Sequence, residues 1–338
     1  MRLRNSGFNH AIHNFRGLAA LAVCLFHFVS KTKDFLEDTI LGELCNYGHY
    51  GVEVFFTISG FVIVKNLNES SYSLSHFWKY FKKRLIRLEP PYLVSLFCLL
   101  LVSAVIIEYK GQAWSEFPDL TNILLHIGYL IPVQISPHSL EGYNWLSPVY
   151  WTLGIEFQFY IIMALVFPVF KKYQYGALVF MGLMAILKLI WHFNPEHQYL
   201  LSSHFQFFTL GIAAYLIANY RNPADLVIFG LILIINFYWG WSWILLFNGL
   251  MVLLFLFLPN IKLKGFYFLG TVSYSLYLFH AVVGTPLLNY TSHYAKTFPE
   301  KLLVLVTVLA ITLGLSYTIY LFVERPSMRW SKRISYKE

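Results

Sequence analysis

Two polar side chains in the first apolar stretch of the chain have the types and the spacing for chemistry. The stretch FRGLAALAVCLFHF, residues 15–28, contains Arg16 near its start and His27 near its end. Eleven helical residues place the two on nearly the same face, about 16 Å apart along the axis. An imidazole can act as a base near cellular pH, and a guanidinium can bind an anion. The structural alternative makes Arg16 a snorkelling membrane anchor and His27 a hydrogen-bonding group at a helix contact.

A second apolar stretch, GVEVFFTISGFVI at residues 51–63, begins with the carboxylate of Glu53. Ser59 and Gly60 lie at its centre, where a glycine allows close backbone approach. These two small residues are typical of a helix–helix contact. Glu53 enters a strongly apolar segment, so it is either an interfacial residue or a functional one.

Two further apolar stretches each contain one ionisable group. WTLGIEFQFY, residues 151–160, contains Glu156, and TVSYSLYLFH, residues 271–280, ends on His280. A carboxylate inside a membrane span must be paired, protonated or turned toward a wet cavity. Glu156 could also be a purely structural buried acid. Turned inward, four such groups would line one polar cavity of a helix bundle: His27, Glu53, Glu156 and His280.

The stretch FWKYFKKRLIRLEPPY, residues 77–92, carries a cluster of positive charge just before Pro90 and Pro91, which are expected to open a membrane helix. Arg84 and Arg87 are three residues apart and therefore share a helix face. Their planar guanidiniums match phosphate oxygens, so the pair suits a phosphate-bearing cytosolic ligand. The alternative is a positive belt in contact with anionic lipid, which is favoured for the neighbouring lysines.

The composition indicates which elements must position these groups. Of the 338 residues, 57% are hydrophobic and only 12% are charged, and the mean hydropathy is +0.57. Continuous apolar runs of this kind predict an all-α integral membrane protein. We expect one domain, 1–338, without internal repeats or an appended soluble domain, and a short interfacial or re-entrant piece at 121–135. About ten transmembrane helices are expected, at 13–30, 50–66, 90–109, 149–171, 174–192, 203–219, 225–240, 242–258, 270–288 and 301–323.

The charge distribution predicts the orientation of these helices. A cytoplasmic N-terminus followed by ten alternating spans places most of the 25 lysine and arginine residues on the cytoplasmic side. This bias predicts that both termini are cytoplasmic. The net charge of +8 is then a property of membrane topology, so the expected partner is the lipid bilayer and not nucleic acid. No small-residue cleavage site follows the first apolar stretch, which indicates a retained helix and not a signal peptide.

Five stretches of the chain resemble, in the same order, the motifs of the membrane acyltransferase 3 family. They are RGLAALAVCLFH, GVEVFFTISGFVI, RLIRLEPPY, WTLGIEFQFY and SYSLYLFH, and the resemblance extends from about residue 10 to about residue 330. It implies a multi-pass enzyme of the bacterial cytoplasmic (inner) membrane. Such an enzyme transfers an acyl group, commonly acetyl, from cytosolic acyl-coenzyme A to a carbohydrate hydroxyl, with no metal. The implied acceptor is a surface polysaccharide, an oligosaccharide or a lipid-linked sugar.

The same resemblance implies which residues bind the donor and which catalyse transfer. His27 matches the catalytic histidine of the family. Arg84 and Arg87 match the motif implicated in coenzyme A binding, and Arg16 matches the arginine of the first helix, which we expect to assist that binding. Whether His27 acts as a base or carries the acyl group itself is left open by the sequence.

Four further positions follow from the matched motifs. Glu156 and His280 correspond to an acid and a histidine of the family and are expected to belong to the catalytic set. Glu156 could orient His27 and stabilise its imidazolium, by the logic of a Ser-His-Asp triad. Glu53 stands where the family more often has aspartate, and with Ser59 it is expected to contact the substrate.

Two other functional classes remain open from the residues. A transporter or flippase could use the same buried polar groups for proton or substrate passage. It would show no dependence on acyl-coenzyme A, and the sequence lacks the repeat symmetry typical of such carriers. A purely structural membrane subunit is disfavoured, because nothing structural requires so many buried ionisable groups.

Overall fold

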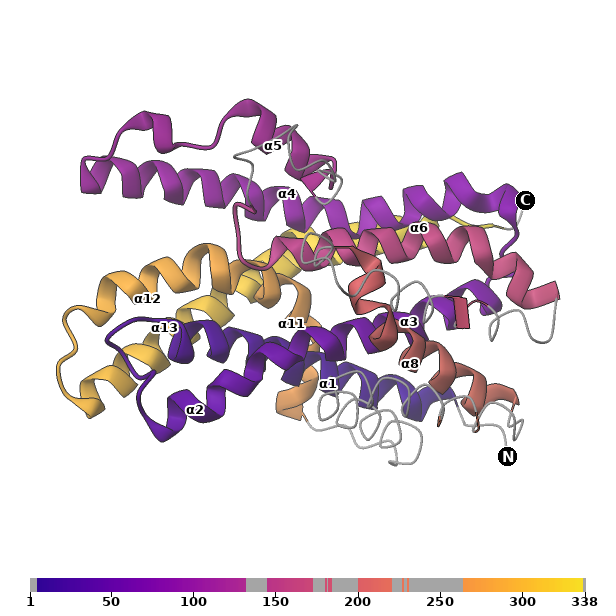
Figure 1. Ribbon diagram of the computed structural model, residues 1–338, viewed down its shortest axis with the longest axis horizontal. Coiled ribbons are helices and arrows are strands. Elements are labelled where there is room, and N and C mark those ends of the chain that lie inside the picture. Colours follow the sequence, from indigo (N-terminus) through magenta and orange to yellow (C-terminus); the bar gives the residue numbers. More distant parts are fainter. Residues whose placement is uncertain are drawn as a thin grey trace.

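A bundle of long helices that run along one common axis makes up the computed structural model of this chain (Figure 1). The structure describes residues 5–131, 145–172, 200–220 and 264–336, together with isolated positions between 180 and 230. Every regular element in this described part is helical, as the all-α expectation requires. Six segments in it are long and apolar enough to cross a membrane. The expected spans 174–192, 225–240 and 242–258 lie outside the described residues, apart from those isolated positions.

The long helices fall where the apolar runs were expected, although most of them extend further. The bounds are α1 Asn5–Leu25, α3 Gly51–Glu69, α4 Phe77–Lys110, α6 Tyr150–Lys172, α8 Leu201–Tyr220, α11 Lys264–Phe279, α12 Thr285–Ser292, α13 Phe298–Ile319 and α14 Arg325–Arg333. Two helices are shorter: α2 Ile40–Asn46 lies at the end of the bundle away from the two chain termini, and α5 Leu120–Ile127 lies beside the middle of α4, where the Tyr92 hydroxyl donates to the His126 carbonyl (Figure 1). With eight residues, α5 is too short to cross a bilayer.

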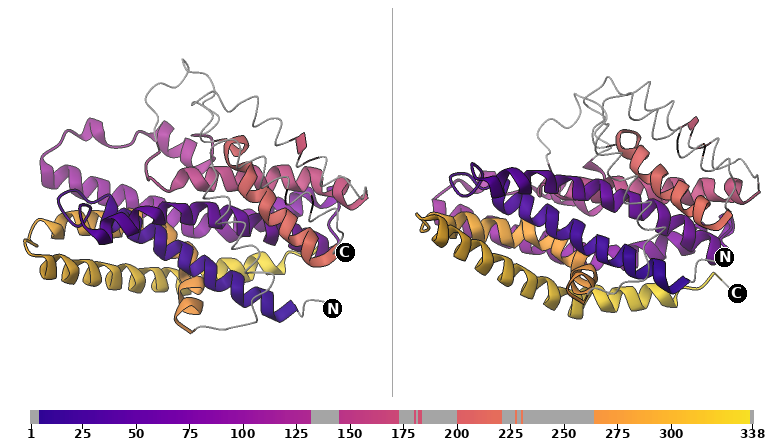
Figure 2. Two further views of the ribbon diagram at one scale, coloured as in Figure 1. Left: turned by 60° about the horizontal axis from the view of Figure 1, so that its bottom comes forward. Right: turned by 90° about the horizontal axis from the view of Figure 1, so that it is seen from below.

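One end of the bundle, here called the basal end, gathers the basic segments of the described chain. It is the end where α1 and α4 begin and where α3 and α14 finish, so the first and last described helices both reach it (Figure 2). There α14 packs against the first turns of α4 through the Ser331 hydroxyl, which donates to the Lys83 carbonyl at 2.9 Å. The two most basic stretches of the sequence therefore lie side by side.

Helix α4 corrects the expectation that Pro90 and Pro91 open a helix. It begins at Phe77 and continues through both prolines to Lys110. A proline at position 91 removes the amide that would bond to the carbonyl of Arg87. That carbonyl lies 3.3 Å from the hydroxyl of Ser327, and the next carbonyl, of Leu88, accepts from the Tyr274 hydroxyl at 2.9 Å. A hydroxyl of a neighbouring helix thus lies beside the carbonyl that Pro91 leaves without its amide, and contacts of this kind let a long helix pass through prolines.

In the described part of the chain, three π-helical turns interrupt the long helices. They span Phe26–Ser30 after α1, His280–Gly284 between α11 and α12, and Tyr320–Glu324 between α13 and α14. Such turns are rare, and they occur often at functional sites because the inserted residue redirects the side chains around it. Each of these three contains an ionisable residue that the helix carries inward: His27, His280 and Glu324.

Glycines let two helix pairs approach closely, as expected for Gly60. A Cβ built on Gly60 would collide with the backbone of Phe208 in α8, and one built on Gly17 would lie 2.8 Å from the Leu269 Cβ in α11. The α3–α8 and α1–α11 contacts are the largest in the described part of the bundle. Gly17 thus sets the distance between α1 and α11, and Gly60 sets the distance between α3 and α8. Helices α1 and α3 carry Arg16 and Ser59.

Substitution of Gly60 by leucine is expected to lower the thermal unfolding temperature of the purified protein by several degrees or more. The new side chain must displace the α8 backbone, and overpacking of this kind costs about 1–3 kcal/mol or more. The matched control is Gly314→Leu in α13, where a Cβ meets no atom within 4 Å. An equal unfolding temperature for both variants would contradict the tight α3–α8 contact.

Candidate active site

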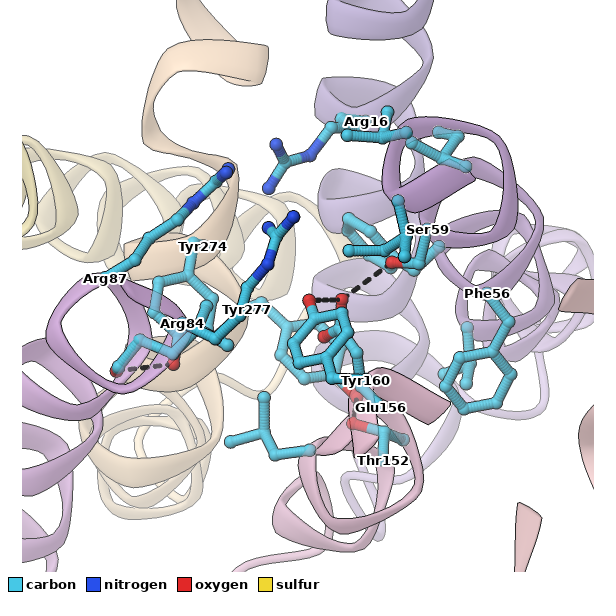
Figure 3. Close-up of a pocket in the computed structure, with 17 residues that line it drawn as sticks. Arg16, Phe56, Ser59, Arg84, Arg87, Thr152, Glu156, Tyr160, Tyr274 and Tyr277 are labelled. Atoms are coloured by element: carbon cyan, nitrogen blue, oxygen red, sulfur yellow. Dashed lines mark hydrogen bonds between the residues drawn. The ribbon is translucent and has the colours of Figure 1, made fainter. Parts of the chain in front are cut away.

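A buried pocket of about 80 Å³ lies among α1, α3, α4, α6 and α11, toward the basal end (Figure 3). Aliphatic and aromatic side chains form most of its wall. The polar residues that line it are Arg16, Ser59, Arg84, Arg87, Thr152, Glu156, Tyr160, Tyr274 and Tyr277. Five of the eight residues singled out from the sequence are brought together here, from four different helices: Arg16, Ser59, Arg84, Arg87 and Glu156.

The three arginines of the pocket direct their guanidiniums toward one region (Figure 3). Arg84 is only 8% exposed and lies between the rings of Tyr80 and Tyr160, each 5.2 Å from its Cζ. Its Nε has no hydrogen-bond partner among the described residues, and none of the three guanidiniums forms an ion pair within that part of the chain. Three converging cations, one of which leaves a buried hydrogen-bond donor unused, favour an anionic ligand.

Glu156 has hydrogen-bond partners other than the one proposed from its sequence motif. The Ser59 hydroxyl donates to its Oε1 at 2.6 Å, and the Tyr160 hydroxyl donates to the same oxygen. Neither of these bonds involves His27, so the triad-like contact proposed from the sequence is absent from the hydrogen bonds of the described residues. Glu156 instead links α3 to α6 beneath the guanidiniums, at the wall of the basic pocket (Figure 3).

A second carboxylate, Glu324, also belongs to this region and was not among the candidates from the sequence. It is 6% exposed at the end of a π-helical turn, and its Oε2 accepts from the Ser275 hydroxyl at 2.6 Å and the Ser275 amide at 3.2 Å. Arg16 and Arg87 act on it electrostatically. It therefore offsets part of the positive charge without closing the pocket with an ion pair.

His27 and His280 form a contact pair. His280 is fully buried, and its Nε2 lies 3.2 Å from Nδ1 of the half-buried His27. The π-helical turns that hold the two residues carry them toward each other from α1 and α11. The sequence singled out both histidines but gave no reason to pair them, because 253 residues separate them.

Backbone carbonyls fix the protons on these two rings. His27 Nδ1 lies 3.0 Å from the Val23 carbonyl, and His280 Nδ1 lies 3.0 Å from the Leu276 carbonyl. Because a carbonyl only accepts, each Nδ1 carries the proton. The single Nδ1 proton of His27 is then shared between the Val23 carbonyl and Nε2 of the neutral His280, and Nε2 of His27 keeps a lone pair. An oriented imidazole with a free Nε2 can take a proton from a substrate.

Glu53 lies in the first turn of α3, in a buried setting. It is 8% exposed, and its Oε2 has no hydrogen-bond partner among the described residues. The Thr57 hydroxyl donates to the backbone carbonyl of Glu53 at 2.9 Å, and this bond does not involve the carboxylate. A buried carboxylate oxygen without a donor is costly and is typical of a residue that meets a ligand.

Tyr277 connects the basic pocket with the histidine pair. It lines the pocket, its ring centroid lies 5.9 Å from that of His280, and its hydroxyl lies 2.8 Å from the Thr152 hydroxyl. Sequence reasoning did not single out Tyr277, Tyr160 or Glu324 as site residues. The spacing of four between Glu156 and Tyr160 was a usable signal, since such residues share a helix face.

The described part of the chain is thus a multi-pass, all-helical membrane protein with a buried cationic pocket and an oriented imidazole pair close by. The chain belongs to the acyltransferase 3 family, whose sequence profile, described as an acyltransferase domain, matches residues 9–321. This match covers nearly the whole chain and identifies a membrane-embedded acyltransferase.

Two relatives among characterised sequences extend this result. A protein described as a membrane-bound transacylase, BcsY of Komagataeibacter xylinus, is 28% identical over 95% of this chain and 83% of its own length. The O-acetyltransferase OatA of Staphylococcus aureus is 25% identical over 82% of this chain and 52% of its own length, so this chain matches only about half of that protein. No solved structure matches this chain.

Proposed function

We propose that this protein is an O-acyltransferase that moves an acyl group, with acetyl favoured, from cytosolic acyl-coenzyme A to a carbohydrate hydroxyl. The observation that carries the proposal is the convergence of Arg16, Arg84 and Arg87 on one buried pocket, where none of them forms an ion pair with another described residue. Coenzyme A supplies the phosphates that such a cluster binds. The acceptor would be a cell-surface or lipid-linked sugar, as the family resemblance of the motifs implies, and the relatedness to an O-acetyltransferase supports acetyl transfer to a hydroxyl.

The proposed reaction uses the free lone pair of His27 Nε2. The hydroxyl oxygen of the acceptor attacks the thioester carbonyl while its proton passes to that nitrogen. The carbon–sulfur bond breaks, an ester forms, and the proton is returned to the thiolate of coenzyme A. His280 accepts from His27 Nδ1 and so acts through His27, as a positioning residue. Glu53 and Ser59 are proposed to contact the substrate, and Glu156 to hold Ser59 and Tyr160 in place.

The proposed setting is the bacterial cytoplasmic membrane with the basal end toward the cytosol. The basic segments on α4 and α14 lie at that end. In membrane proteins, positively charged residues concentrate on the cytosolic side. The donor would then enter from the cytosol at the arginines. The pantetheine arm is long enough to reach from a surface phosphate site into the membrane.

A transfer assay with purified protein in lipid nanodiscs tests this function. Acetyl-coenzyme A labelled in its acetyl group is supplied, and labelled ester on an added glycan acceptor, or release of free coenzyme A, is measured. In parallel, NMR spectra of cell-surface glycans with and without the gene show whether O-acetyl signals are lost. Transport of a sugar or lipid without consumption of acetyl-coenzyme A would instead favour the carrier alternative.

Replacement of His280 by alanine is expected to lower kcat about tenfold and to leave the KM for acetyl-coenzyme A unchanged. The substitution removes one hydrogen-bond acceptor of His27, a loss of about 1–1.5 kcal/mol. His280→Gln keeps an acceptor near the position of Nε2 and should recover most of the rate. Equal losses for alanine and glutamine, or a change in KM alone, would contradict the positioning role.

A further inference from the structure

A second cavity opens at the basal end, beside the basic pocket. It encloses about 320 Å³ between the end of α3, the first turns of α4 and α14 with the residues that follow it. Arg84 and Arg87 line both cavities, so the two meet at these guanidiniums. A ligand whose phosphates bind the arginines can therefore extend in two directions, deeper into the bundle or out toward the basal surface.

The two cavities differ in volume, so they suit different parts of a ligand. The inner pocket holds about 80 Å³ and suits a thin linear chain, whereas the basal cavity holds about 320 Å³ and suits a ring system. Acyl-coenzyme A has one part of each kind: a linear acyl-pantetheine arm and a 3′-phosphorylated adenosine. Its diphosphate joins the two parts, at the place where the arginines join the two cavities.

The wall of the basal cavity contains two tyrosines, Tyr80 and Tyr336. The ring of Tyr336 stacks on His76 at a centroid distance of 5.6 Å and contacts Tyr72 at 6.0 Å. The ammonium of Lys83 lies 5.1 Å from the Tyr336 ring centroid. Burial raises the pKa of Tyr336 to about 12, so the ring remains a neutral phenol beside a phosphate. An aromatic ring held in this way can stack on a nucleobase.

The residues after α14 are attached to the cavity wall by hydrogen bonds. Lys83 Nζ donates to the carbonyl of Ile334 at 3.3 Å, and one turn earlier the Ser331 hydroxyl bonds to the Lys83 carbonyl. Tyr336 therefore reaches the cavity as part of a docked segment. Its ring lies among Tyr72 in the loop after α3, His76 at the end of the short 3₁₀ turn Leu74–His76, and Lys83 of α4.

The charge on the cavity wall suits phosphate. Lys83 and Lys332 line it together with the two arginines, and the acid Glu69 is paired with Lys65 at 3.9 Å. The Nε of Arg84, a buried donor without a partner among the described residues, adds an unused binding capacity at the junction. The cavity thus combines fixed aromatic rings, which favour a base, with cations that favour phosphate groups.

We propose that the basal cavity binds the 3′-phosphoadenosine part of the acyl donor, with Tyr336 stacking on the base and Lys83 and Lys332 contacting phosphates. This assignment rests on the proposed use of acyl-coenzyme A. It makes the last residues of the chain part of the donor site. An anionic phospholipid headgroup shares the phosphate chemistry but offers nothing for the tyrosine rings to stack on.

Binding measurements on the full-length protein in phosphatidylcholine nanodiscs test the assignment. Three probes are compared by titration calorimetry: acetyl-coenzyme A, adenosine 3′,5′-bisphosphate, and acetyl-4′-phosphopantetheine, which lacks the nucleotide. Tyr336→Ala should weaken the first two about tenfold and leave the third unchanged. Tyr336→Trp should keep the affinity of the wild-type protein. The control Trp330→Ala removes an exposed aromatic ring from α14 that does not line the cavity and should change none of the three.

Several outcomes would overturn the assignment while acetyl-coenzyme A is still consumed. They are an unchanged affinity of Tyr336→Ala for all probes, an equal loss for acetyl-4′-phosphopantetheine, and no binding of adenosine 3′,5′-bisphosphate to the wild-type protein. Loss of bisphosphate binding when phosphatidylglycerol is added to the nanodiscs would identify a lipid headgroup site instead. If the wild-type protein neither binds nor consumes acetyl-coenzyme A, the proposed function fails, and this assignment fails with it.

Discussion

Replacement of His27 by alanine is expected to lower acyl transfer about 1,000-fold, with the KM for acetyl-coenzyme A nearly unchanged. The variant loses the only group proposed to take the proton of the acceptor, and general base catalysis contributes roughly 10²–10⁴ in rate. The arginine pocket does not contain His27, so donor binding should survive. Transfer of labelled acetyl to a glycan acceptor, measured at several donor concentrations, gives kcat and KM separately.

The control for this experiment is His293→Ala, which removes an exposed imidazole just after α12 and should leave transfer unchanged. Equal expression and thermal stability of the variants show that His27→Ala remains folded. Incubation of wild-type protein with labelled donor and no acceptor tests the alternative in which His27 carries the acyl group. Label retained on the protein would contradict the role of His27 as a base, and full activity of His27→Ala would remove it from catalysis altogether.

Substitution of Arg84 by alanine is expected to raise the KM for acetyl-coenzyme A about 100-fold with a smaller effect on kcat. The guanidinium can form two charge-assisted hydrogen bonds to phosphate, and bonds of this kind contribute about 1.5–3 kcal/mol each. Arg84→Lys should recover little of the loss. A lysine lacks the planar fork and cannot lie between the rings of Tyr80 and Tyr160 in the same way.

Lys79→Ala is the matched control for Arg84, because Lys79 is an exposed cation on the same helix. Its removal should change the KM by less than twofold. The comparison separates a site-specific loss from a general loss of positive charge at the basal end, which would respond equally in both variants. An unchanged KM in Arg84→Ala would show that the donor does not bind at the convergence of arginines.

The apolar runs located the long helices because membrane insertion demands continuous hydrophobicity, which can be seen without any tertiary contact. The start of α4 was wrong for a tertiary reason. The two prolines indicated a helix start, and the hydroxyl that lies beside the carbonyl interrupted by Pro91 comes from Ser327, 240 residues further along. The ends of the last two expected spans were also wrong. A π-helical turn joins α11 to α12 and another joins α13 to α14, so each helical segment continues beyond its apolar run.

In the candidate site, too, the sequence predicted local groupings but not the contacts that depend on tertiary packing. Arg84 and Arg87 could be grouped from the sequence because residues three apart share a helix face. The motifs also singled out His27 and His280, but the contact between them depends on the packing of α1 against α11. The carboxylate proposed to orient His27 was Glu156, and its bonds to Ser59 and Tyr160 could not be foreseen, because they depend on how α3 and α6 face each other.

The Ser327 hydroxyl, which lies near both the Arg87 and Glu324 carbonyls, has a practical meaning for work on this protein. A shortened chain that lacks α14 would leave a carbonyl unpaired in the turn of α4 that carries Arg87. It would also remove the residues that attach to Lys83. Loss of activity after a C-terminal deletion would therefore reflect damage to a distant helix as well as the missing segment. Deletion boundaries and affinity tags are best placed beyond Tyr336.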